Sequence, residues 1–197
     1  MTREQERDEL HRAIWQIAND LRGSVDGWDF KSYVLGLLFY RFISENLVNH
    51  INKSEWETGN KDFDYANVPD DQAEFGRKDT VNEKGFYILP SELFQNVQKN
   101  ASNNKDLNVD LHRIFKDIES SANGSDSEDD LKGLFDDVDV NSNKLGGTVE
   151  QRNARLGKIL KAIAGLKLGE YQDNAIDAFG DAYEYLMRHF ATESGKS

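Results

Sequence analysis

The apolar run between residues 33 and 43, YVLGLLFYRFI, constrains the fold more strongly than any other part of this sequence. A helix predicted over residues 30–52, with Asp29 as its N-cap, would be apolar nearly all round through this run. Such a helix has to be central in the fold and packed on several sides. The run is too short to cross a membrane, which takes about 20 residues. We therefore expect a buried central helix whose more polar continuation, from Ser44 onward, leaves the core.

A positive charge lies inside this apolar run. Arg41 would be costly if it were buried without a partner. We expect it to pair with a core carboxylate, such as one supplied by the last helix of the chain.

Helical spacing of apolar residues continues elsewhere, and it predicts a mainly α fold. Four more helices are indicated by this spacing: residues 3–21, 107–118, 150–164 and 176–190. Phe86 to Leu89 is predicted as a short extended or β segment ended by Pro90, and Ser91 as the cap of a short helix through Val97. Residues 53–84 lack periodicity and are predicted to be irregular. The expected architecture is a compact helical bundle with one short extended segment near 86–89 and irregular acidic loops.

Composition excludes several kinds of site. The 197 residues contain no cysteine, which rules out disulfides, thiolate metal sites and a cysteine nucleophile. The N-terminus lacks the apolar run of a signal peptide, so a soluble intracellular domain is predicted. The net charge of −12 opposes long-range attraction to nucleic acid, so the chain is not expected to bind DNA on its own. A local basic face could still contact DNA within a complex.

The sequence contains no recognisable catalytic or metal-binding motif. Its four histidines are scattered and never pair at helical spacing around a glutamate, which disfavours a metal site. No glycine-rich nucleotide loop and no nucleophile elbow occur. There is also no Pro-Pro dipeptide, so the element with which amino-methyltransferases hold a flipped base is missing.

Charge is distributed unevenly along the chain. Residues 117–139 hold nine acidic residues and a single lysine, which is typical of a solvated face, and their spacing does not match a calcium-binding loop. Residues 150–167 hold five basic residues and one acid. Two interpretations of this basic helix stay open: contact with a phosphate backbone, or a solvated helix face. The cations that cluster on its predicted surface are Arg152, Arg155, Lys158 and Lys161.

Four stretches carry more specific patterns. Two are long: GLFDDVDVNSNKLGGTVEQRNARLGKIL at residues 133–160 and DAFGDAYEYLMRHFATESGK at residues 177–196. Two are shorter: W-x-x-A-x-D-L-R-G at residues 15–23, followed by DFK and LLFYRFIS, and FYILPSELF at residues 86–94. Together they span nearly the whole chain. In these four stretches the chain resembles the N-terminal domain of type I restriction–modification methyltransferase (M) subunits.

This resemblance implies that residues 1–190 form a helical N-terminal domain, and that residues 191–197 are a linker toward a catalytic domain absent from this sequence. In that family the catalytic domain binds S-adenosylmethionine and methylates adenine at N6 in DNA. No catalytic, cofactor-binding or metal-binding residue of the family can be carried over to this chain. The chain alone is therefore expected to be no enzyme and to hold no cofactor, with S-adenosylmethionine serving the parent subunit.

The resemblance also implies a structural function: assembly of the complex and clamping of DNA, in the bacterial or archaeal cytoplasm and without membrane contact. The implied partners are a specificity subunit, a second methyltransferase subunit, a restriction subunit and double-stranded DNA held within the complex. The candidates for contacts to the DNA backbone are Arg152, Arg155, Lys158, Lys161, Lys144, Arg22 and Lys31. The candidates for contacts to the catalytic domain are Tyr183, Glu184 and Tyr185.

The sequence also permits other roles for some of these residues and other functions for the whole chain. Arg22 and Lys31 fit a capping or ion-pair role equally well, and Tyr183 is in phase with apolar helix positions, which favours packing. The chain could instead be a stand-alone acidic helical adaptor that binds other proteins, or a DNA mimic that blocks restriction enzymes. The mimic is disfavoured because the carboxylates concentrate in residues 117–139 and do not spread along the surface.

The isolated chain is expected to transfer no methyl group to DNA and to show no binding of S-adenosylmethionine. A radiolabelled methyl-transfer assay and calorimetry would check this, with a complete methyltransferase complex as the positive control. Measurable turnover by the isolated chain would contradict the assignment of catalysis to residues outside it.

Overall fold

The computed structural model describes residues 27–166 and four earlier single residues, Gln5, Asp8, Arg12 and Gln16, which are helical. The predicted first helix, residues 3–21, is described only at those four positions. The predicted last helix, residues 176–190, lies outside the described residues. For residues 27–32 only the backbone is described.

The described part of the chain is built from helices. In chain order they are α2 (Gly27–Glu57), η1 (Tyr65–Asn67), α3 (Asp70–Ala73), η2 (Glu74–Gly76), α4 (Arg77–Lys84), η3 (Pro90–Glu92), α5 (Phe94–Asn100), η4 (Ala101–Asn103), α6 (Leu107–Ser121), α7 (Glu128–Leu131) and α8 (Val149–Ala164). Residues 86–89 run in an extended conformation, and no strand occurs between residues 27 and 166. The prediction of a mainly α bundle with a short extended segment is confirmed.

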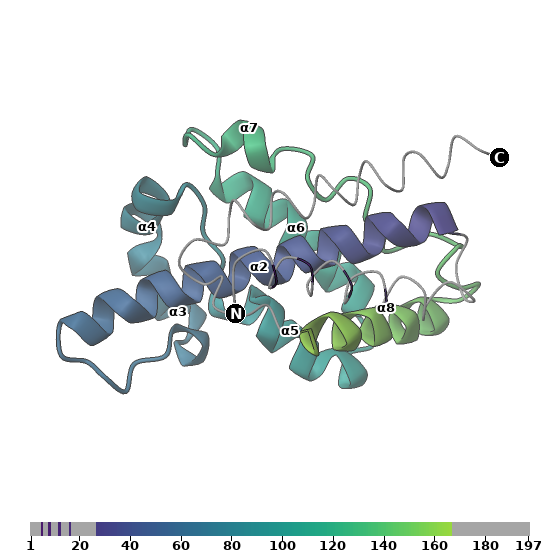
Figure 1. The fold of residues 1–197 in the computed structure, drawn as a ribbon, viewed down its shortest axis with the longest axis horizontal. Helices are drawn as coiled ribbons and strands as arrows, with labels where there is room; N and C mark the ends of the chain where they lie inside the picture. Colours follow the sequence, from purple (N-terminus) through teal and green to yellow (C-terminus); the bar gives the residue numbers. More distant parts are fainter. Residues whose placement is uncertain (1–4, 6–7, 9–11, 13–15, 17–26, 167–197) are drawn as a thin grey trace.

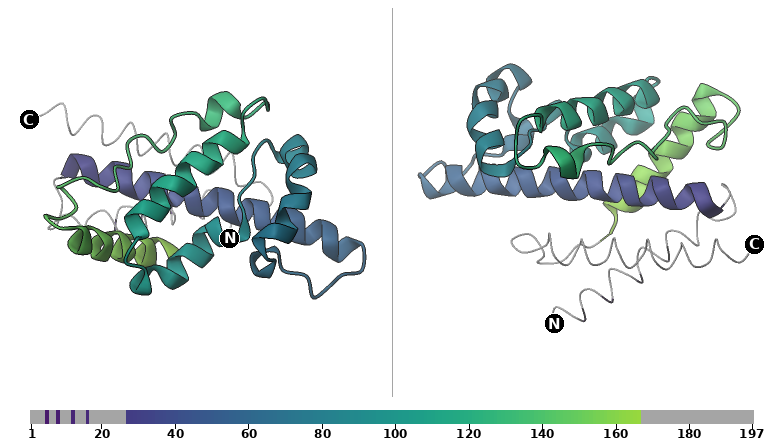
Figure 2. Two further views of the ribbon diagram at one scale, coloured as in Figure 1. Left: turned by 180° about the vertical axis from the view of Figure 1, so that it is seen from behind. Right: turned by 90° about the horizontal axis from the view of Figure 1, so that it is seen from above.

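Helix α2 is the central element, as its apolar composition predicts. It runs through the length of the molecule in Figure 1, with α7 above it and α5 and α8 below it, and α6 crosses behind it. Viewed from above, the helices from α3 to α7 lie on one side of α2 (Figure 2). Its buried apolar side chains occur on all faces: Tyr33, Val34, Leu35, Leu37, Leu38, Tyr40, Phe42, Ile43, Leu47 and Val48. The helix begins at Gly27, so Asp29 lies inside its first turn and the prediction of an Asp29 N-cap was wrong.

The helix leaves the core more gradually than the predicted exit at Ser44: Glu45, Asn46, Asn49 and His50 are partly exposed, but Ser44 is buried. Ser44 is 0% exposed, Asn52 is 5% exposed, and after Tyr33 the helix first reaches an exposed side chain at Lys53. Both polar residues are buried because they cap other elements. The Phe94 N–H donates to Ser44 Oγ at 3.1 Å, and the Tyr65 N–H donates to Asn52 Oδ1 at 2.8 Å.

Tyr40 lies at the centre of the core. It is 0% exposed, and its ring meets Phe94, Phe115 and Phe135 edge-on, with centroids 5.5, 5.6 and 6.5 Å away. Such edge-to-face geometry is the favoured arrangement of aromatic pairs. The Tyr40 hydroxyl donates to the carbonyl oxygen of Glu92, so the ring's one polar atom is also satisfied.

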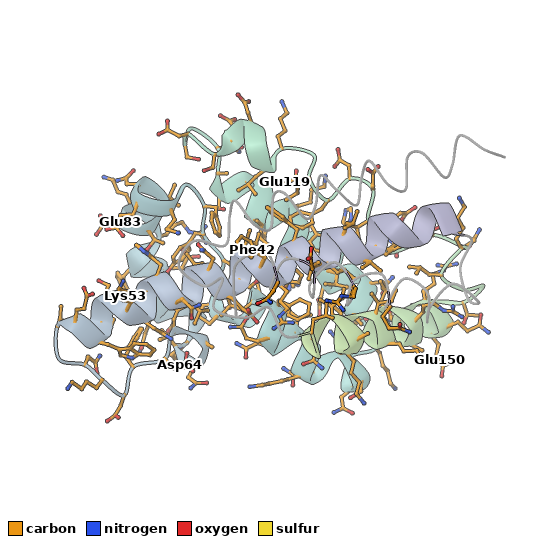
Figure 3. The ribbon with its side chains drawn as sticks, in the orientation of Figure 1. Phe42, Lys53, Asp64, Glu83, Glu119 and Glu150 are labelled. Carbon is orange, nitrogen blue, oxygen red and sulfur yellow. The ribbon has the colours of Figure 1, made fainter. Side chains whose placement is uncertain are left out.

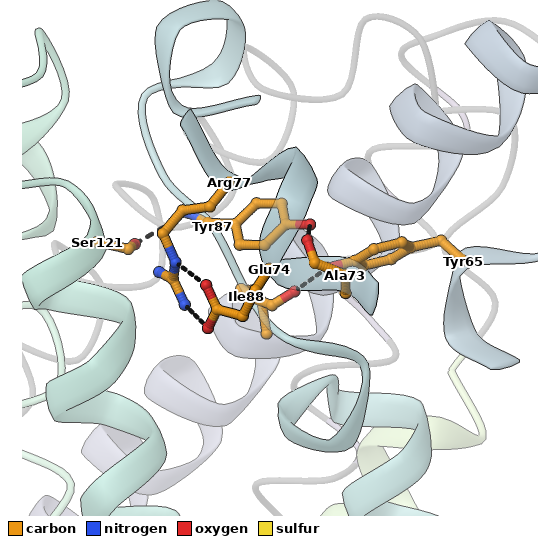
Figure 4. A network of polar contacts seen from close by, with 7 residues as sticks. All are labelled: Tyr65, Ala73, Glu74, Arg77, Tyr87, Ile88 and Ser121. Atoms are coloured by element: carbon orange, nitrogen blue, oxygen red, sulfur yellow. Dashed lines mark hydrogen bonds and ion pairs between the residues drawn. The ribbon is translucent and has the colours of Figure 1, made fainter. Parts of the chain in front are cut away.

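Residues 53–84 were predicted to be irregular, but they form the end of α2 and short helical turns held by two tyrosines (Figure 4). Tyr65 donates its hydroxyl to the Ile88 carbonyl at 2.7 Å, and Tyr87 donates to the Ala73 carbonyl at 2.5 Å. Arg77 lies over the Tyr87 ring, 5.2 Å from its centroid, while its guanidinium binds both carboxylate oxygens of Glu74 at 2.8 Å. Buried tyrosines thus order a segment that has no hydrophobic periodicity of its own.

Ser91 does not cap a helix through Val97 as predicted. It lies in η3, and both its backbone N–H and its hydroxyl donate to the carboxylate of Asp70. Helix α5 begins after Leu93 instead, with its first N–H on Ser44.

The predicted helix over residues 107–118 is confirmed as α6, which extends to Ser121 and buries Leu107, Leu111, Ile114, Phe115 and Ile118. The acidic segment after it is anchored by apolar side chains, among them Leu131, Phe135 and Val138. Val138 crosses α2 at Gly36, where a Cβ on Gly36 would lie 2.2 Å from Val138 Cγ2. The lack of a side chain at Gly36 therefore allows the segment around Val138 to pack directly against α2.

Glu92, in η3, is a buried carboxyl of which 6% is exposed. Its Oε2 atom has no hydrogen-bond donor among the described residues. Burial raises the pKa of Glu92 to about 8, reinforced by a hydrogen bond to Asp117 and by the charge of that residue, and opposed by Arg113. Since its ordinary pKa is 4.5, the Glu92 carboxyl is mainly protonated at neutral pH.

Substitution of Gly36 by alanine is expected to destabilise the domain by about 1–3 kcal/mol, because the new methyl group overpacks against Val138. In a Val138→Ala background the same substitution should be neutral, or stabilising by up to about 1 kcal/mol, since alanine favours helix over glycine. Urea unfolding of the four proteins measures the coupling. Equal effects of Gly36→Ala in both backgrounds would contradict the proposed close approach.

The free energy of unfolding is expected to fall as the pH rises from 4.5 to about 8, because the unfolded chain releases a proton that folded Glu92 retains. The contribution of Glu92 to the slope is at most about 1.4 kcal/mol per pH unit. Glu92→Gln should flatten this part of the profile and stabilise the protein at the alkaline end. Glu150→Gln, at an exposed position, is the control and should leave the slope unchanged. If the free energy of unfolding of Glu92→Gln changes with pH as steeply as that of the wild type, the pKa of Glu92 is not raised in the folded protein.

Candidate nucleic-acid interface

Helix α8 carries the basic segment found in the sequence. Two reciprocal hydrogen bonds cap its N-terminus. Thr148 Oγ1 accepts the Gln151 N–H at 3.1 Å, and Gln151 Oε1 accepts the Gly147 N–H at 3.0 Å. This reciprocal pairing is close to a capping box, in which a threonine and a glutamine three residues later satisfy two free N–H groups. The T-x-x-Q pattern at residues 148–151 is a signal for this start that the sequence analysis missed.

The inner face of α8 is fully buried. Leu156, Ile159, Leu160 and Ile163 are each 0% exposed, which confirms the predicted apolar stripe. Asn153, 8% exposed, lies among them. Its Nδ2 donates to the Lys105 carbonyl at 2.8 Å, and its Oδ1 accepts the Asn108 N–H at 3.0 Å. Asn153 therefore fixes α8 to the start of α6.

The C-terminal end of α8 is held by Arg41 of α2. Arg41 Nη1 donates to the carbonyl oxygens of Ile163 and Leu166 at 2.6 and 2.7 Å. Its Nε pairs with Glu45 at 2.8 Å. The predicted carboxylate partner is therefore found on Arg41's own helix, and the expected partner from the last helix lies outside the described residues.

The outer face of α8 carries the candidate cations. Lys158 and Lys161 are exposed, and neither makes an ion pair within the described ranges. With 3.6 residues per turn, Lys158 points away from the buried positions, and Lys161 and Arg155 flank it. Arg155 is half-buried, and its Nη1 finds no acceptor among residues 27–166. We call the surface formed by Arg155, Lys158 and Lys161 the outer basic arc.

Arg152 is not part of this arc. Its Nε donates to the Gly146 carbonyl and its Nη2 to Asn143 Oδ1, both at 2.9 Å. The side chain thereby ties the turn at residues 141–147 to the first turns of α8. Lys144, in that turn, is exposed.

The other predicted site residues cannot be placed. Arg22, Tyr183, Glu184 and Tyr185 lie outside the described residues, and the side chain of Lys31 is not described.

The acidic segment and the outer basic arc belong to different parts of the fold. Helix α7, inside the acidic segment, lies above α2 in Figure 1, whereas α8 lies below it. Helix α8 packs against α2, α5 and α6, and α7 packs against α6. The arc is thus spatially separated from the main cluster of carboxylates.

Other kinds of site find little support in the described residues. No group of three or more metal-ligating side chains is found there, and none of the helices described combines the length and apolar character needed to cross a bilayer. An open hollow of about 410 Å³ is lined by residues including Val68, Asp70 and Asn96. The polar groups of Asp70 and Asn96 already bind Ser91 and two backbone carbonyls, so the hollow offers few groups for a ligand.

Comparisons with known proteins agree on one family. A family model described as the HsdM N-terminal domain matches residues 10–163. The chain is 48% identical over 202 residues to the type I restriction enzyme MpnII methylase subunit of Mycoplasma pneumoniae, an alignment that covers 99% of this chain and 37% of that protein. The crystal structure of a type I restriction-modification system methyltransferase subunit from Streptococcus thermophilus superposes with a TM-score of 0.74 at 28% identity, covering 94% of this chain and 39% of that one. The chain thus spans well under half the length of either relative.

Proposed function

Because this chain belongs to the HsdM N-terminal domain family, we propose that it assembles a type I restriction–modification complex and clamps its DNA. The parent subunit would transfer a methyl group from S-adenosylmethionine to adenine N6, with the chemistry carried by residues outside this chain. The proposed partners are the specificity subunit, a second methyltransferase subunit, the restriction subunit and double-stranded DNA, in the cytoplasm of the cell.

The observation that carries the DNA-clamping proposal is the outer basic arc of α8. Its two lysines extend from a helix that is fixed along its inner face and at both ends. Cations on a rigid support suit contacts to phosphates, which position a protein on DNA without reading its sequence. The specificity subunit would supply the sequence recognition.

The net charge of −12 does not prevent such a contact. Helix α7, in the acidic segment, and α8 lie on opposite sides of α2 in the view of Figure 1. Exposed charges more than about 10 Å apart are largely screened at 0.1 M salt, so carboxylates farther than that from the arc repel DNA there only weakly. The overall charge still disfavours DNA binding by the domain alone, which makes binding dependent on the complex.

An adaptor that only binds proteins is the second candidate function. Phe75 in η2 is 90% exposed, and aromatic side chains of this kind are enriched at protein interfaces. This observation also fits the assembly half of the proposed function. A DNA mimic fits less well, because the arc presents cations on the surface.

Charge reversal in the arc is expected to weaken DNA binding by the assembled complex. Lys158→Glu with Lys161→Glu removes two phosphate contacts, so the slope of log K against log salt should fall by about 0.9 for each lost contact. Fluorescence anisotropy with a DNA duplex, measured over a salt series, gives the slope.

Lys53→Glu with Lys61→Glu is the matched control, since both lysines are exposed and the charge change is the same. Figure 3 shows Lys53 near one end of the molecule and Glu150, in the first turn of α8, near the other. The control should leave the slope nearly unchanged. An identical slope for the arc variant and the wild-type complex would remove α8 from the DNA surface and favour the adaptor.

A further inference from the structure

The turn after α6 contains an asparagine followed by a glycine. Asn123-Gly124 is the only Asn-Gly pair in the 197 residues. Gly124 has a φ of +80°, a conformation that glycine adopts without strain. The turn is closed by the Ser125 N–H, which donates to the Ala122 carbonyl at 3.0 Å. Both Asn123 and Gly124 are exposed to solvent.

The surroundings of this pair favour attack of the backbone on the side chain. Within the described part of the chain, no hydrogen bond restrains the side-chain amide of Asn123, and its backbone N–H donates to the Ser120 carbonyl at 3.2 Å. The Gly124 N–H donates to Glu128 Oε2 at 3.2 Å. Glycine has no Cβ to obstruct the approach of its nitrogen to the preceding side chain. A carboxylate on the attacking N–H is in position to accept its proton, as a general base does.

We propose that Asn123 is a site of spontaneous deamidation, with Glu128 as the base. The Gly124 nitrogen forms a bond to Asn123 Cγ, and its proton passes to the Glu128 carboxylate. The bond from Cγ to Nδ2 breaks, and the leaving nitrogen takes the proton back from Glu128 and departs as ammonia. Water then opens the resulting succinimide at either carbonyl, which yields aspartate or isoaspartate. No oxidant, metal or cofactor takes part.

Asn141-Ser142 offers a comparison within the same chain. It also combines an exposed asparagine with a small following residue. The Asn141 side chain is held, however, because its Oδ1 accepts from Asn108 Nδ2 at 2.6 Å. The Ser142 N–H donates to the Asp139 carbonyl oxygen at 3.3 Å, not to a carboxylate. Asn141 should therefore deamidate much more slowly than Asn123.

The modification changes a turn that connects two parts of the fold. Ser125 Oγ lies 2.8 Å from the Gly85 carbonyl oxygen and 2.6 Å from that of Ala122, so its hydroxyl can link the α6–α7 connection to the end of α4. Deamidation adds one negative charge to the acidic segment, and isoaspartate also inserts a methylene group into the main chain between residue 123 and Gly124, one residue before Ser125. The isoaspartate form should therefore loosen this link.

The test is peptide mapping by mass spectrometry after incubation of the folded chain in mildly alkaline buffer at physiological temperature. Asn123 should convert to aspartate and isoaspartate at least about tenfold faster than Asn141. Glu128→Gln should slow the conversion roughly tenfold, less than the ~10²-fold contributed by a base in a fully organised active site. Circular dichroism of each variant before incubation confirms that the fold is retained.

Asp129→Asn is the matched control, because it removes the same charge from the neighbouring exposed residue. It should leave the rate at Asn123 unchanged. The proposal is overturned if Asn123 converts no faster than Asn141, or if Glu128→Gln and Asp129→Asn slow the conversion equally. A slower reaction in Glu128→Gln alone supports it.

Discussion

Three helix ends in this domain, those of α5, α6 and α8, are satisfied by side chains from other helices. The first N–H of α5 donates to Ser44 of α2, and an N–H at the start of α6 donates to Asn153 of α8. The last carbonyls of α8 accept from Arg41 of α2. A buried donor or acceptor left without a partner costs about 1–3 kcal/mol. Each of these contacts therefore favours one placement of a helix along its neighbour, which apolar packing alone specifies less sharply.

This constraint explains how an acidic domain can present a defined basic surface. Helix α8 is fixed along its inner face by four fully buried apolar residues and by Asn153, and at its end by Arg41. Its rotation about its own axis is therefore set, and Lys158 and Lys161 of the outer basic arc point to solvent while Arg155 is half-buried. Arg152, on the flank of the same helix, holds the adjoining turn. The angular position of each cation on α8 thus decides its role. Arg152 stabilises the fold, whereas Lys158 and Lys161 are available to a partner.

Much of the fold could be predicted because apolar periodicity reports burial directly. The central helix, α6 and α8 follow from it, whereas the extended segment at residues 86–89 follows from the constraint that Pro90 puts on the residue before it. The errors concern polar residues whose partners are distant in sequence. Ser44 indicated that the helix leaves the core there, and Ser91 indicated a helix cap. The sequence does not reveal that Ser44 meets the Phe94 N–H or that Ser91 meets the Asp70 carboxylate. For the same reason, the sequence did not predict that Arg152 binds the turn at residues 141–147 or that Arg155 is half-buried.

The central claim is that the outer basic arc meets the DNA backbone when the complex is assembled. Chemical acetylation of lysines in the assembled complex, read by mass spectrometry with and without a DNA duplex, tests this claim without altering the sequence. Lys158 and Lys161 should be protected from acetylation by DNA, while Lys53 and Lys61 should react equally in both states. Equal labelling of Lys158 and Lys161 with and without bound DNA would contradict the account.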